Sequence, residues 1–404
     1  MHSKEQIGEI NTKMKTIVHI EEFFHPDAGY QVNVLAKYLA AEGYKVYIVT
    51  AELDKIPNYL TDFFGREDIE KRDQCYFEKY GVNIIRIPLL TYVSGRAIFS
   101  KSLWKVICDL GPDVLFVHGC DTYTGIKIIR KAIKFDCKIV TDNHMVDVAS
   151  KNPLRGLFRL YYKYFVTPHI IRNKIPVIRL VDDEYVKVRL GIPLRLSPII
   201  SFGSDLMLFS PNQDVRRSFR KDIGIDEEAL VFCYAGKLDE FKGGKLLAQA
   251  LQEKLDFAKE TVFIIIGNIS GEYGSEVEEI FEKSANRILR FPTQKYEDLS
   301  KFYQISDIAL FPKACSLSFF DVQACGLPVL SENIDINIQR CSHGNGLNFE
   351  ADNVQDLREK IFYMGNLEEE KLNQMKNASV SFIRSEYDYK NKLREYIDIF
   401  EKGI

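Results

Sequence analysis

The fold of this chain is indicated most clearly by residues 229–244, which read ALVFCYAGKLDEFKGG. The apolar run 229–235 is typical of a buried strand, and a helical pattern over 245–255 follows the closing glycines. Glycine lets a backbone approach an anion closely, and the start of a helix offers free N–H donors with a favourable dipole. Lys237 and Lys242 place positive charge at both ends of the loop. The stretch predicts a strand–loop–helix unit that binds a diphosphate, unless both lysines are only solvated surface charges.

A second stretch, DVQACGLP at residues 321–328, supplies a carboxylate at the predicted start of another helix. In that position Asp321 is suited to accept hydrogen bonds from the hydroxyls of a ribose. The alternative is an ordinary carboxylate that complements the dipole at a helix N-terminus. Together with the lysine loop, this stretch predicts a site for a nucleotide diphosphate.

Apolar strands alternate with helical segments on both sides of the lysine loop, which is typical of parallel sheets covered on both faces. The alternation runs once through the first half of the chain and starts again at residue 230. Strands are expected at 15–24, 44–50, 82–87, 114–117 and 138–141, and then at 230–234, 261–267, 287–291, 308–311 and 328–331.

This pattern predicts an α/β fold of two Rossmann-like, doubly wound domains that face a cleft, where the carboxyl ends of both sheets bind ligands. We divide the chain into a disordered tail, an acceptor-side domain, a nucleotide-binding domain and a closing helix that packs back on the first domain. The expected boundaries are 1–13, 14–204, 205–385 and 386–404.

The composition describes a folded protein that is expected to lie in the cytoplasm. A chain of 404 residues exceeds what one core usually holds. Its net charge of -3 argues against a nucleic-acid-binding protein. The eight cysteines are scattered without a CxxC pair, so we expect reduced thiols and no metal site. Neither a signal peptide nor a run of apolar residues long enough to span a membrane is apparent.

An ordered set of motifs extends these two stretches over nearly the whole chain from residue 14 onward. The set comprises His25-Pro-Asp-Ala-Gly29, Phe202-Gly-Ser-Asp205, Gly236-Lys-x5-Gly-Gly, Leu299-x3-Tyr303-x3-Asp307, Asp321-x4-Gly326-Leu-Pro and Gly344-Asn-Gly346. In this order it resembles the retaining GT-B glycosyltransferases of glycosyltransferase family four. The resemblance implies transfer of a sugar from a UDP- or GDP-linked donor to a glycan, without a metal or other cofactor.

The resemblance also implies a set of residues that bind the donor. The family holds the diphosphate with an arginine and a lysine, and the matching residues here are Lys237, a departure from arginine, and Lys242. Asp321 matches the second acid of the family's Glu-x7-Glu motif, whereas Lys313 stands where the first acid would be. The implied donor-binding residues are Gly29, Gly236, Lys237, Lys242, Phe291, Ser316, Leu317, Ser318 and Asp321.

The same resemblance implies how the reaction proceeds. The leaving phosphate helps to deprotonate the acceptor, and Lys237 and Lys242 stabilise the charge that develops on the diphosphate. His144 matches a histidine that lines the family's reaction centre, although a single histidine is as often structural. The candidates on the acceptor side are His25, Asp27, His118 and Asp121.

Residues 151–174 contain no acid and suggest what the acceptor is. Arg155, Arg159 and Lys163 recur every four residues among aromatic and leucine side chains, a pattern typical of a helix lying on an anionic membrane. This fits a lipid-linked acceptor in the synthesis of a surface polysaccharide such as capsule, O-antigen or exopolysaccharide. The alternative is a core-packing helix with a solvated basic face.

Two other functions remain open from the sequence. A family member that lacks the acid at Lys313 could serve as a binding partner in a biosynthetic complex instead of an enzyme. Nucleotide-sugar 2-epimerases share the two-domain plan, but they use acidic and histidine residues of the second domain. His343 is the only histidine in that half of this chain.

Overall fold

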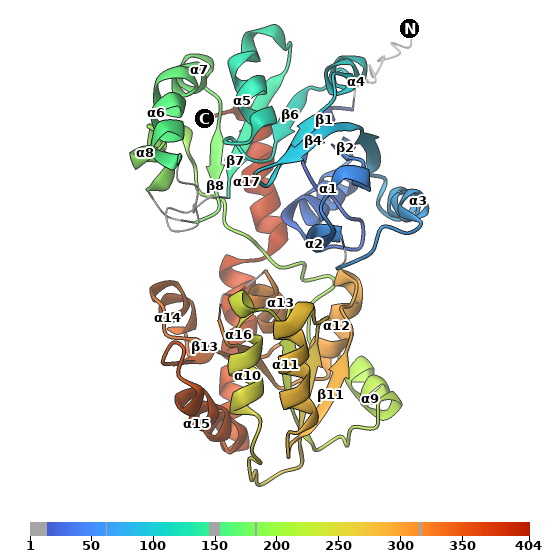
Figure 1. Cartoon of the computed structure of the whole chain (residues 1–404), viewed down its shortest axis with the longest axis vertical. Coiled ribbons are helices and arrows are strands. Elements are labelled where there is room, and N and C mark those ends of the chain that lie inside the picture. Colours follow the sequence, from blue (N-terminus) through green and yellow to red (C-terminus); the bar gives the residue numbers. More distant parts are fainter. Residues whose placement is uncertain (1–13, 62, 145–153, 182–183, 314, 316) are drawn as a thin grey trace, which may run out of the picture.

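The computed structural model describes residues 14–61, 63–144, 154–181, 184–313, 315 and 317–404. Two α/β domains lie one above the other along the long axis of the molecule (Figure 1). Each domain is built on a parallel sheet of six strands, which confirms the predicted fold class. The tail predicted for residues 1–13 lies outside the described residues.

The first sheet has the strand order β3-β2-β1-β6-β7-β8, with the first strand of the chain near its middle. Its members are β1 (Thr16–Ile20), β2 (Lys45–Ala51), β3 (Asn83–Ile87), β6 (Val114–Val117), β7 (Lys138–Asn143) and β8 (Val177–Arg179). A separate antiparallel pair consists of β4 (Leu89–Val93) and β5 (Arg96–Phe99). The sequence pattern did not predict β8 or this pair.

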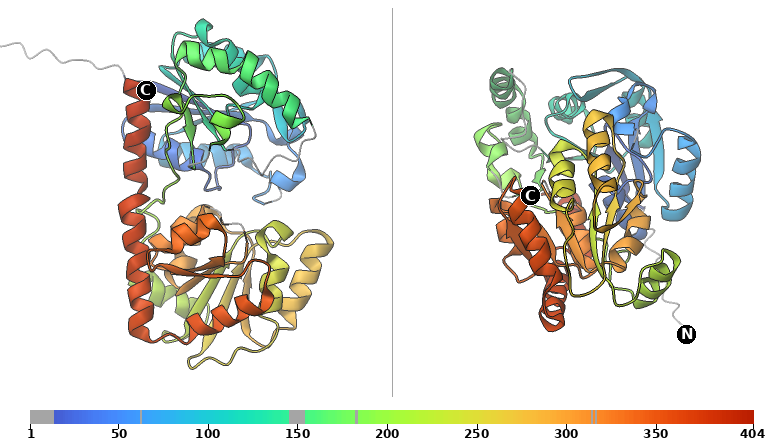
Figure 2. Two further views of the ribbon diagram at one scale, coloured as in Figure 1. Left: turned by 90° about the vertical axis from the view of Figure 1, so that its left-hand side faces the viewer. Right: turned by 60° about the horizontal axis from the view of Figure 1, so that its bottom comes forward.

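Helices cover both faces of the first sheet (Figures 1 and 2). They are α1 (Gln31–Ala41), α2 (Asn58–Thr61), α3 (Ile69–Tyr80), α4 (Ser102–Leu110), α5 (Tyr123–Arg130), α6 (Arg155–Phe165), α7 (Thr167–Asn173) and α8 (Tyr185–Val188). Short 3₁₀ turns occur at η1 (Leu53–Lys55), η2 (Ala132–Lys134) and η4 (Leu194–Leu196).

The second sheet repeats this topology in the order β11-β10-β9-β12-β13-β14. Its strands are β9 (Leu230–Ala235), β10 (Thr261–Ile266), β11 (Arg287–Phe291), β12 (Ile308–Phe311), β13 (Val329–Glu332) and β14 (Gly346–Phe349). Around them lie α9 (Gln213–Asp222), η5 (Glu240–Lys242), α10 (Gly244–Ala250), α11 (Gly271–Glu282), α12 (Tyr296–Gln304), α13 (Ser318–Ala324), α14 (Asp335–Cys341), α15 (Val354–Gly365) and α16 (Glu369–Glu386).

Each sheet is sandwiched between two apolar cores, because its strands carry apolar side chains on both faces. In β9, for example, Val231 and Cys233 point to one core while Phe232 and Tyr234 point to the other. All four side chains are buried, as expected for a central parallel strand.

The chain crosses between the domains twice, at two segments that lie side by side. The Ser204 N–H donates to the Tyr387 carbonyl at 2.7 Å, and the Tyr389 N–H donates to the Ser204 carbonyl at 3.1 Å. After the second crossing, α17 (Tyr389–Lys402) packs against the first domain, and its Leu393 and Tyr396 share a core with Ile17 and other residues of the first sheet. Figure 2 shows α16 and α17 running along one side of both domains.

Candidate nucleotide-sugar site between the domains

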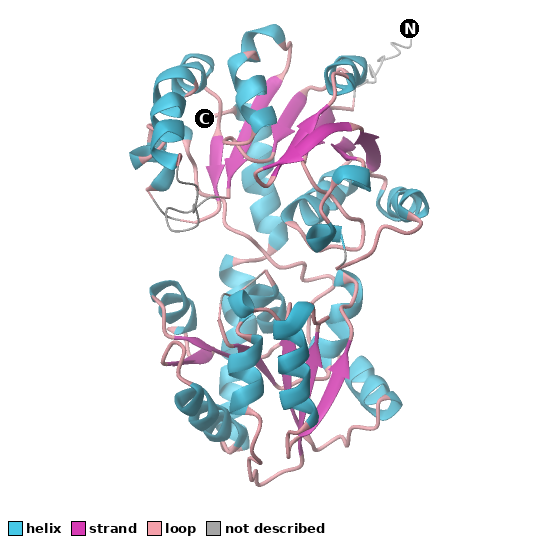
Figure 3. Ribbon diagram, viewed as in Figure 1, coloured by secondary structure: helices cyan, strands magenta, loops and turns pink. Residues whose placement is uncertain are grey.

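Loops of the two domains approach each other at the carboxyl ends of the strands (Figure 3). A cavity of about 660 Å³ is lined by residues of both domains. The second domain contributes residues that follow β9, β10, β11 and β12, and the first domain contributes its first loop and the segment after α2. Of the predicted donor-binding residues, the cavity brings together Gly29, Gly236, Lys237, Lys242, Leu317, Ser318 and Asp321. Ser316 lies outside the described residues.

The lysine loop forms a tight turn directly after β9. The Asp239 carboxylate accepts a hydrogen bond from the Lys242 N–H at 2.9 Å and so closes η5. Gly243 has a φ of 72°, in the left-handed region, and a Cβ there would lie 2.9 Å from the Lys313 side chain. Glycine is therefore needed at position 243 both for the turn and for the close packing against β12.

The two lysines of the loop stand in different surroundings. Lys237 is exposed, and its ammonium lies 5.4 Å from the centre of the Phe63 ring of the first domain. Lys242 is half-buried, and burial lowers the pKa of its ammonium. The negative charge of a bound anion would compensate the ammonium of Lys242 for its lost hydration. Lys242 is therefore the stronger candidate for binding phosphate.

Gly29 borders the cavity, but it makes room for a tyrosine of the second domain. A Cβ on Gly29 would lie 2.0 Å from the ring of Tyr296. In the same contact, the Tyr296 N–H donates to the carbonyl of Asp27 at 3.0 Å. The loop that was predicted to approach a phosphate therefore also forms a direct contact between the domains.

Asp321 lies at the cavity wall but is almost completely buried. Its Oδ1 accepts hydrogen bonds from the hydroxyl of Ser204 at 2.7 Å and from that of Tyr296 at 3.5 Å. Burial raises the pKa of the Asp321 carboxyl to about 7. One carboxylate oxygen is thus already occupied by protein groups, and the carboxyl is only partly ionised near neutral pH.

Two further positions of the predicted donor site differ from expectation. Lys313, where the family's first acid would be, forms an ion pair with Asp352 at 2.6 Å and does not line the cavity. Phe291 packs edge-on against Phe302 in the core of the second domain and does not line the cavity either. The cavity wall on that side is formed instead by Thr293 and its neighbour Gln294.

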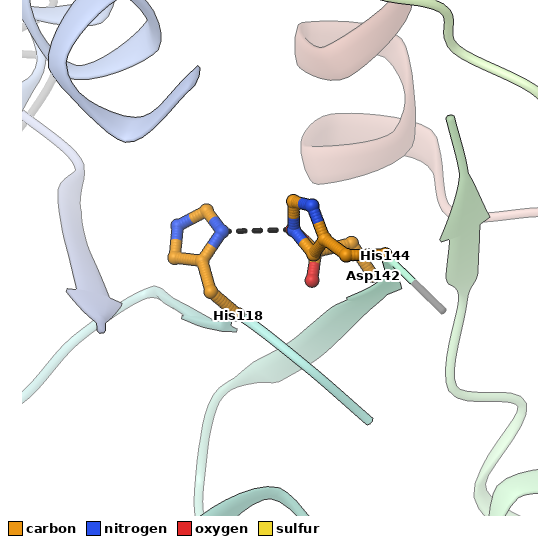
Figure 4. Close-up of side chains that lie close together, drawn as sticks. All are labelled: His118, Asp142 and His144. Carbon is orange, nitrogen blue, oxygen red and sulfur yellow. Dashed lines mark hydrogen bonds and ion pairs between the residues drawn. The ribbon is translucent and has the colours of Figure 1, made fainter. Parts of the chain in front are cut away.

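On the first domain, His118, Asp142 and His144 form a compact cluster at the ends of β6 and β7 (Figure 4). The Oδ2 of Asp142 is 2.8 Å from Nδ1 of His118 and 3.2 Å from Nε2 of His144. The other oxygen of Asp142, Oδ1, accepts a hydrogen bond from the Gly119 N–H at 2.6 Å. Nδ1 of His19 is 3.0 Å from Nε2 of His118. Histidine and aspartate side chains can also bind a metal ion, but these hydrogen bonds are enough to explain why the three side chains lie close together.

Asp142 sets the charge of the cluster. Burial disfavours ionised groups here, yet the positive charges of His144 and His118 hold the pKa of Asp142 well below its usual range. Burial likewise opposes protonation of His144, but the neighbouring carboxylate raises the pKa of His144 to about 9. His144 has an exposed side-chain fraction of 43%, against 3% for His118, so His144 is the histidine that can meet a substrate.

The remaining acceptor-side candidates are engaged elsewhere. His25 is completely buried and stacks on Phe64, so the structure does not present its side chain to an acceptor. Burial lowers the pKa of His25 to about 4. Asp27 forms ion pairs with Arg72 and Lys295 at a smaller cavity of about 280 Å³. Asp121 lies 3.5 Å from the guanidinium of Arg96.

Sequence reasoning missed several residues of the cavity and of the histidine cluster. Asp142 precedes His144 by two residues, and this spacing on a strand places both side chains on one side, so the signal was present. Tyr296, Phe63 and Arg340 line the cavity from segments that carry no recognisable motif. Only the folded structure brings them to the site.

Comparison with known proteins places the second domain in a family. Residues 215–381 match the family described as Glycosyl transferases group 1. D-inositol 3-phosphate glycosyltransferase of Corynebacterium jeikeium is 30% identical over 145 residues, which cover 33% of this chain and 34% of that protein. The enzyme of the same name from Segniliparus rotundus is 25% identical over 144 residues, which cover 34% of this chain and 31% of that protein. The chain spans about a third of the length of these curated relatives.

Solved structures match the chain over nearly its whole length. A glycosyltransferase from Rickettsia africae superposes with a TM-score of 0.73 at 16% identity and covers 97% of this chain and 99% of that chain. HepE of Anabaena, solved with UDP and glucose, gives a TM-score of 0.69 at 14% identity over 96% of this chain and 100% of that chain. These likenesses concern the fold. Residues 215–381 of the second domain thus match the Glycosyl transferases group 1 family, and the whole chain has the two-domain GT-B fold.

Proposed function

We propose that this protein is a glycosyltransferase that binds a nucleotide-diphosphate sugar between its domains and transfers the sugar to a glycan acceptor. One observation carries the proposal: a single cavity of about 660 Å³ is bordered by the lysine loop, by the start of α13 and by the first loop of the other domain. Such a cavity, at the carboxyl ends of two doubly wound sheets, is where this type of fold binds ligands. The match of the second domain to a glycosyltransferase family supports the same assignment.

The chemistry follows from the charges around the cavity. As the bond between sugar and diphosphate breaks, negative charge accumulates on the diphosphate, and Lys242 and Lys237 are placed to stabilise it. These two cations supply the role that a metal ion plays in other transferases, so we propose a metal-independent reaction. The base of the nucleotide would lie beside Thr293 and Gln294.

We further propose that transfer retains the configuration at the sugar carbon. The acceptor hydroxyl would approach the same face from which the diphosphate leaves and give its proton to the leaving phosphate. His144 lies directly after β7 in the first domain and is kept protonated by Asp142, and we propose that it stabilises negative charge or holds a hydroxyl of the sugar.

The test is release of nucleotide diphosphate from a panel of UDP- and GDP-sugars in the presence of candidate glycan acceptors. We expect Lys242→Ala to lower kcat/KM by about 10²-fold or more, since it removes a charged contact made to the leaving group. Lys254→Ala, a change of the same type at an exposed side chain of the same domain, serves as the control. Unchanged turnover by Lys242→Ala would refute the assignment of the phosphate site.

We propose that the acceptor is linked to a lipid in the synthesis of a surface polysaccharide, and that the protein acts at the cytoplasmic face of a membrane. Among the described residues, no helix has both the length and the apolar character needed to span a bilayer. Helix α6 supports peripheral attachment, because Leu157, Leu160 and Tyr164 are all more than half exposed along one side of it. Lys163, which is exposed, adds positive charge beside this apolar stripe.

The membrane proposal is tested by co-sedimentation with vesicles of phosphatidylglycerol and phosphatidylcholine. Replacement of Leu157 and Leu160 by Asp should abolish binding, and Lys163→Glu should weaken it in low salt. The control exchanges Leu90, an equally exposed leucine on β4, for Asp. Equal binding by all variants would remove α6 as the attachment site. Residues 151–153 of the predicted basic segment lie outside the described residues.

A second function, as a nucleotide-binding partner without turnover, is favoured by one observation. The acids that the resemblance led us to expect at the site are either replaced, at Lys313, or already hydrogen-bonded within the protein, at Asp321. Tight binding of nucleotide without turnover of any donor would support this function. A 2-epimerase is disfavoured, because His343 stacks on Phe382 and does not line the cavity between the domains.

A further inference from the structure

Arg340 is a third cation in the wall of the cavity, and it lies outside the phosphate loop. It lies on α14, next to the loop that carries Cys315, and it is mostly shielded from solvent. Its guanidinium lies 5.5 Å from the ring centre of Phe319 and 5.0 Å from that of Phe320. Rings at these distances hold the planar guanidinium in a fixed orientation while leaving its N–H donors available.

Within the described part of the chain, no carboxylate neutralises this guanidinium. Among the residues that the structure describes, Arg340 takes part in no ion pair, and its side chain donates no hydrogen bond. Burial lowers the pKa of its guanidinium, the expected sign for a cation that has lost water without gaining an anion. An arginine kept in this state is costly unless a ligand supplies the missing charge.

The surroundings indicate where that charge would lie on a bound donor. Cys315 lines the same cavity and is close enough to both Lys242 and Arg340 for each cation to act on its thiol. Lys237 and Lys242 already match the two charges of a diphosphate. Arg340 therefore adds a third cation to the wall of this cavity, beyond the two that the diphosphate would neutralise.

The acid content of the site favours a donor group over an acceptor group as the partner of Arg340. The only acid in the described wall of the cavity is Asp321, which is largely buried and hydrogen-bonded to Ser204. The acids that gather near the acceptor side, such as Glu21 and Asp142, belong to the first domain and lie around His144. An anionic acceptor would meet those acids, whereas an anionic donor sugar would lie against the cationic second domain.

We propose that Arg340 is a specificity-determining residue that binds a carboxylate on the donor sugar, so that the preferred donor is a nucleotide-linked uronic acid. This inference rests on the proposed function and narrows its substrate class. A guanidinium binds a carboxylate through two parallel hydrogen bonds, which a neutral hydroxymethyl group cannot replace.

The experiment measures dissociation constants by calorimetry for UDP, UDP-glucose and UDP-glucuronate, and for GDP, GDP-mannose and GDP-mannuronate. The wild type should bind the uronate of one series about tenfold or more tightly than its neutral counterpart. Arg340→Gln should remove that preference while changing the affinity for the free nucleotide diphosphate less than about twofold. Arg340→Lys should retain part of the preference, since lysine keeps the positive charge but lacks the two parallel N–H donors of the guanidinium.

Arg384→Gln makes the same change at an exposed arginine of the same domain and should leave all affinities unchanged. Melting temperatures of the variants show whether each one is folded, and Arg340→Lys provides the readout if Arg340→Gln is not. Equal loss of affinity for UDP and UDP-glucuronate in Arg340→Gln would mean that the arginine binds the diphosphate, and would overturn the inference. Nucleotide binding without any preference for a uronate would overturn it too and leave the proposed function standing, whereas no binding of any nucleotide would overturn both.

Discussion

The contact between Gly29 and Tyr296 predicts a specific coupling between the two domains. A Cβ at position 29 would lie 2.0 Å from the Tyr296 ring, whereas carbon atoms in contact need at least about 3.5 Å, so Gly29→Ala must separate the groups by roughly 1.5 Å. Position 29 requires glycine because of the nearby Tyr296 ring and not because of its backbone, which is not in the left-handed region. The variant therefore isolates a single steric contact across the interface.

The magnitude follows from what that displacement breaks. Overpacking costs about 1–3 kcal/mol, and loss of the hydrogen bond from the Tyr296 N–H to the Asp27 carbonyl adds about 0.5–1.5 kcal/mol. We expect Gly29→Ala to lower the melting temperature by roughly 2–4 °C for each kcal/mol lost, and to weaken nucleotide binding because one wall of the cavity moves.

The assay is a double-mutant cycle with Tyr296→Ala. Once the ring is removed, a methyl group on residue 29 meets nothing that it can displace, so Gly29→Ala should have almost no effect in the Tyr296→Ala background. The expected coupling energy is the whole cost of the substitution, about 1.5–4.5 kcal/mol. If Gly29→Ala is equally damaging with and without the ring, the methyl group acts through something other than Tyr296, and the reasoning is refuted.

Three further predictions concern charge and packing. Burial raises the pKa of Asp321 from an ordinary value of about 4 to about 7, so its contribution to stability falls as the pH rises between these values. In denaturant unfolding, Asp321→Asn should therefore gain a few kcal/mol relative to wild type between pH 4 and pH 8, and a constant difference would contradict this. The pKa of His144 is raised to about 9, so the stability that its ion pair contributes is complete below about pH 6.5 and is lost as the pH rises through 9. In Asp142→Asn, NMR titration should find the pKa of His144 lowered by at least one unit. An unchanged pKa would show that Asp142 does not keep His144 protonated. Phe400→Ala should cost about 3–5 kcal/mol in unfolding of the first domain, since this ring is buried against Phe116; a loss confined to the second domain would be the contrary result.

Much of the fold could be predicted because central parallel strands are buried on both faces and read as continuous apolar runs. β9 and β10 are of this kind, and both lie where the pattern placed them. The edge strand β8 has only three residues and β14 contains Asn348, so neither produces an apolar run long enough to recognise. Short edge strands depend on their neighbours more than on their own sequence.

The site could be predicted only where residues act close together in sequence. The loop from Gly236 to Gly244 works through backbone turns and adjacent charges, which the sequence displays directly. Asp321 shows the limit of such reasoning, because its state depends on Ser204, which is distant in sequence and approaches only through the crossing between the domains. The partners of His25 and Arg340 are likewise set by tertiary packing, and no local pattern reveals them.

The return of α17 to the first domain has a consequence for synthesis of the protein on the ribosome. Leu393, Tyr396 and Phe400 complete a core whose other members come from the earliest strands and helices of the chain. The amino-terminal domain must therefore wait, with that apolar surface uncovered, until α17 has left the exit tunnel. A nascent chain that stalls in the second domain would expose this apolar surface to chaperones, and a substitution that disrupts α17 would impair maturation of the first domain.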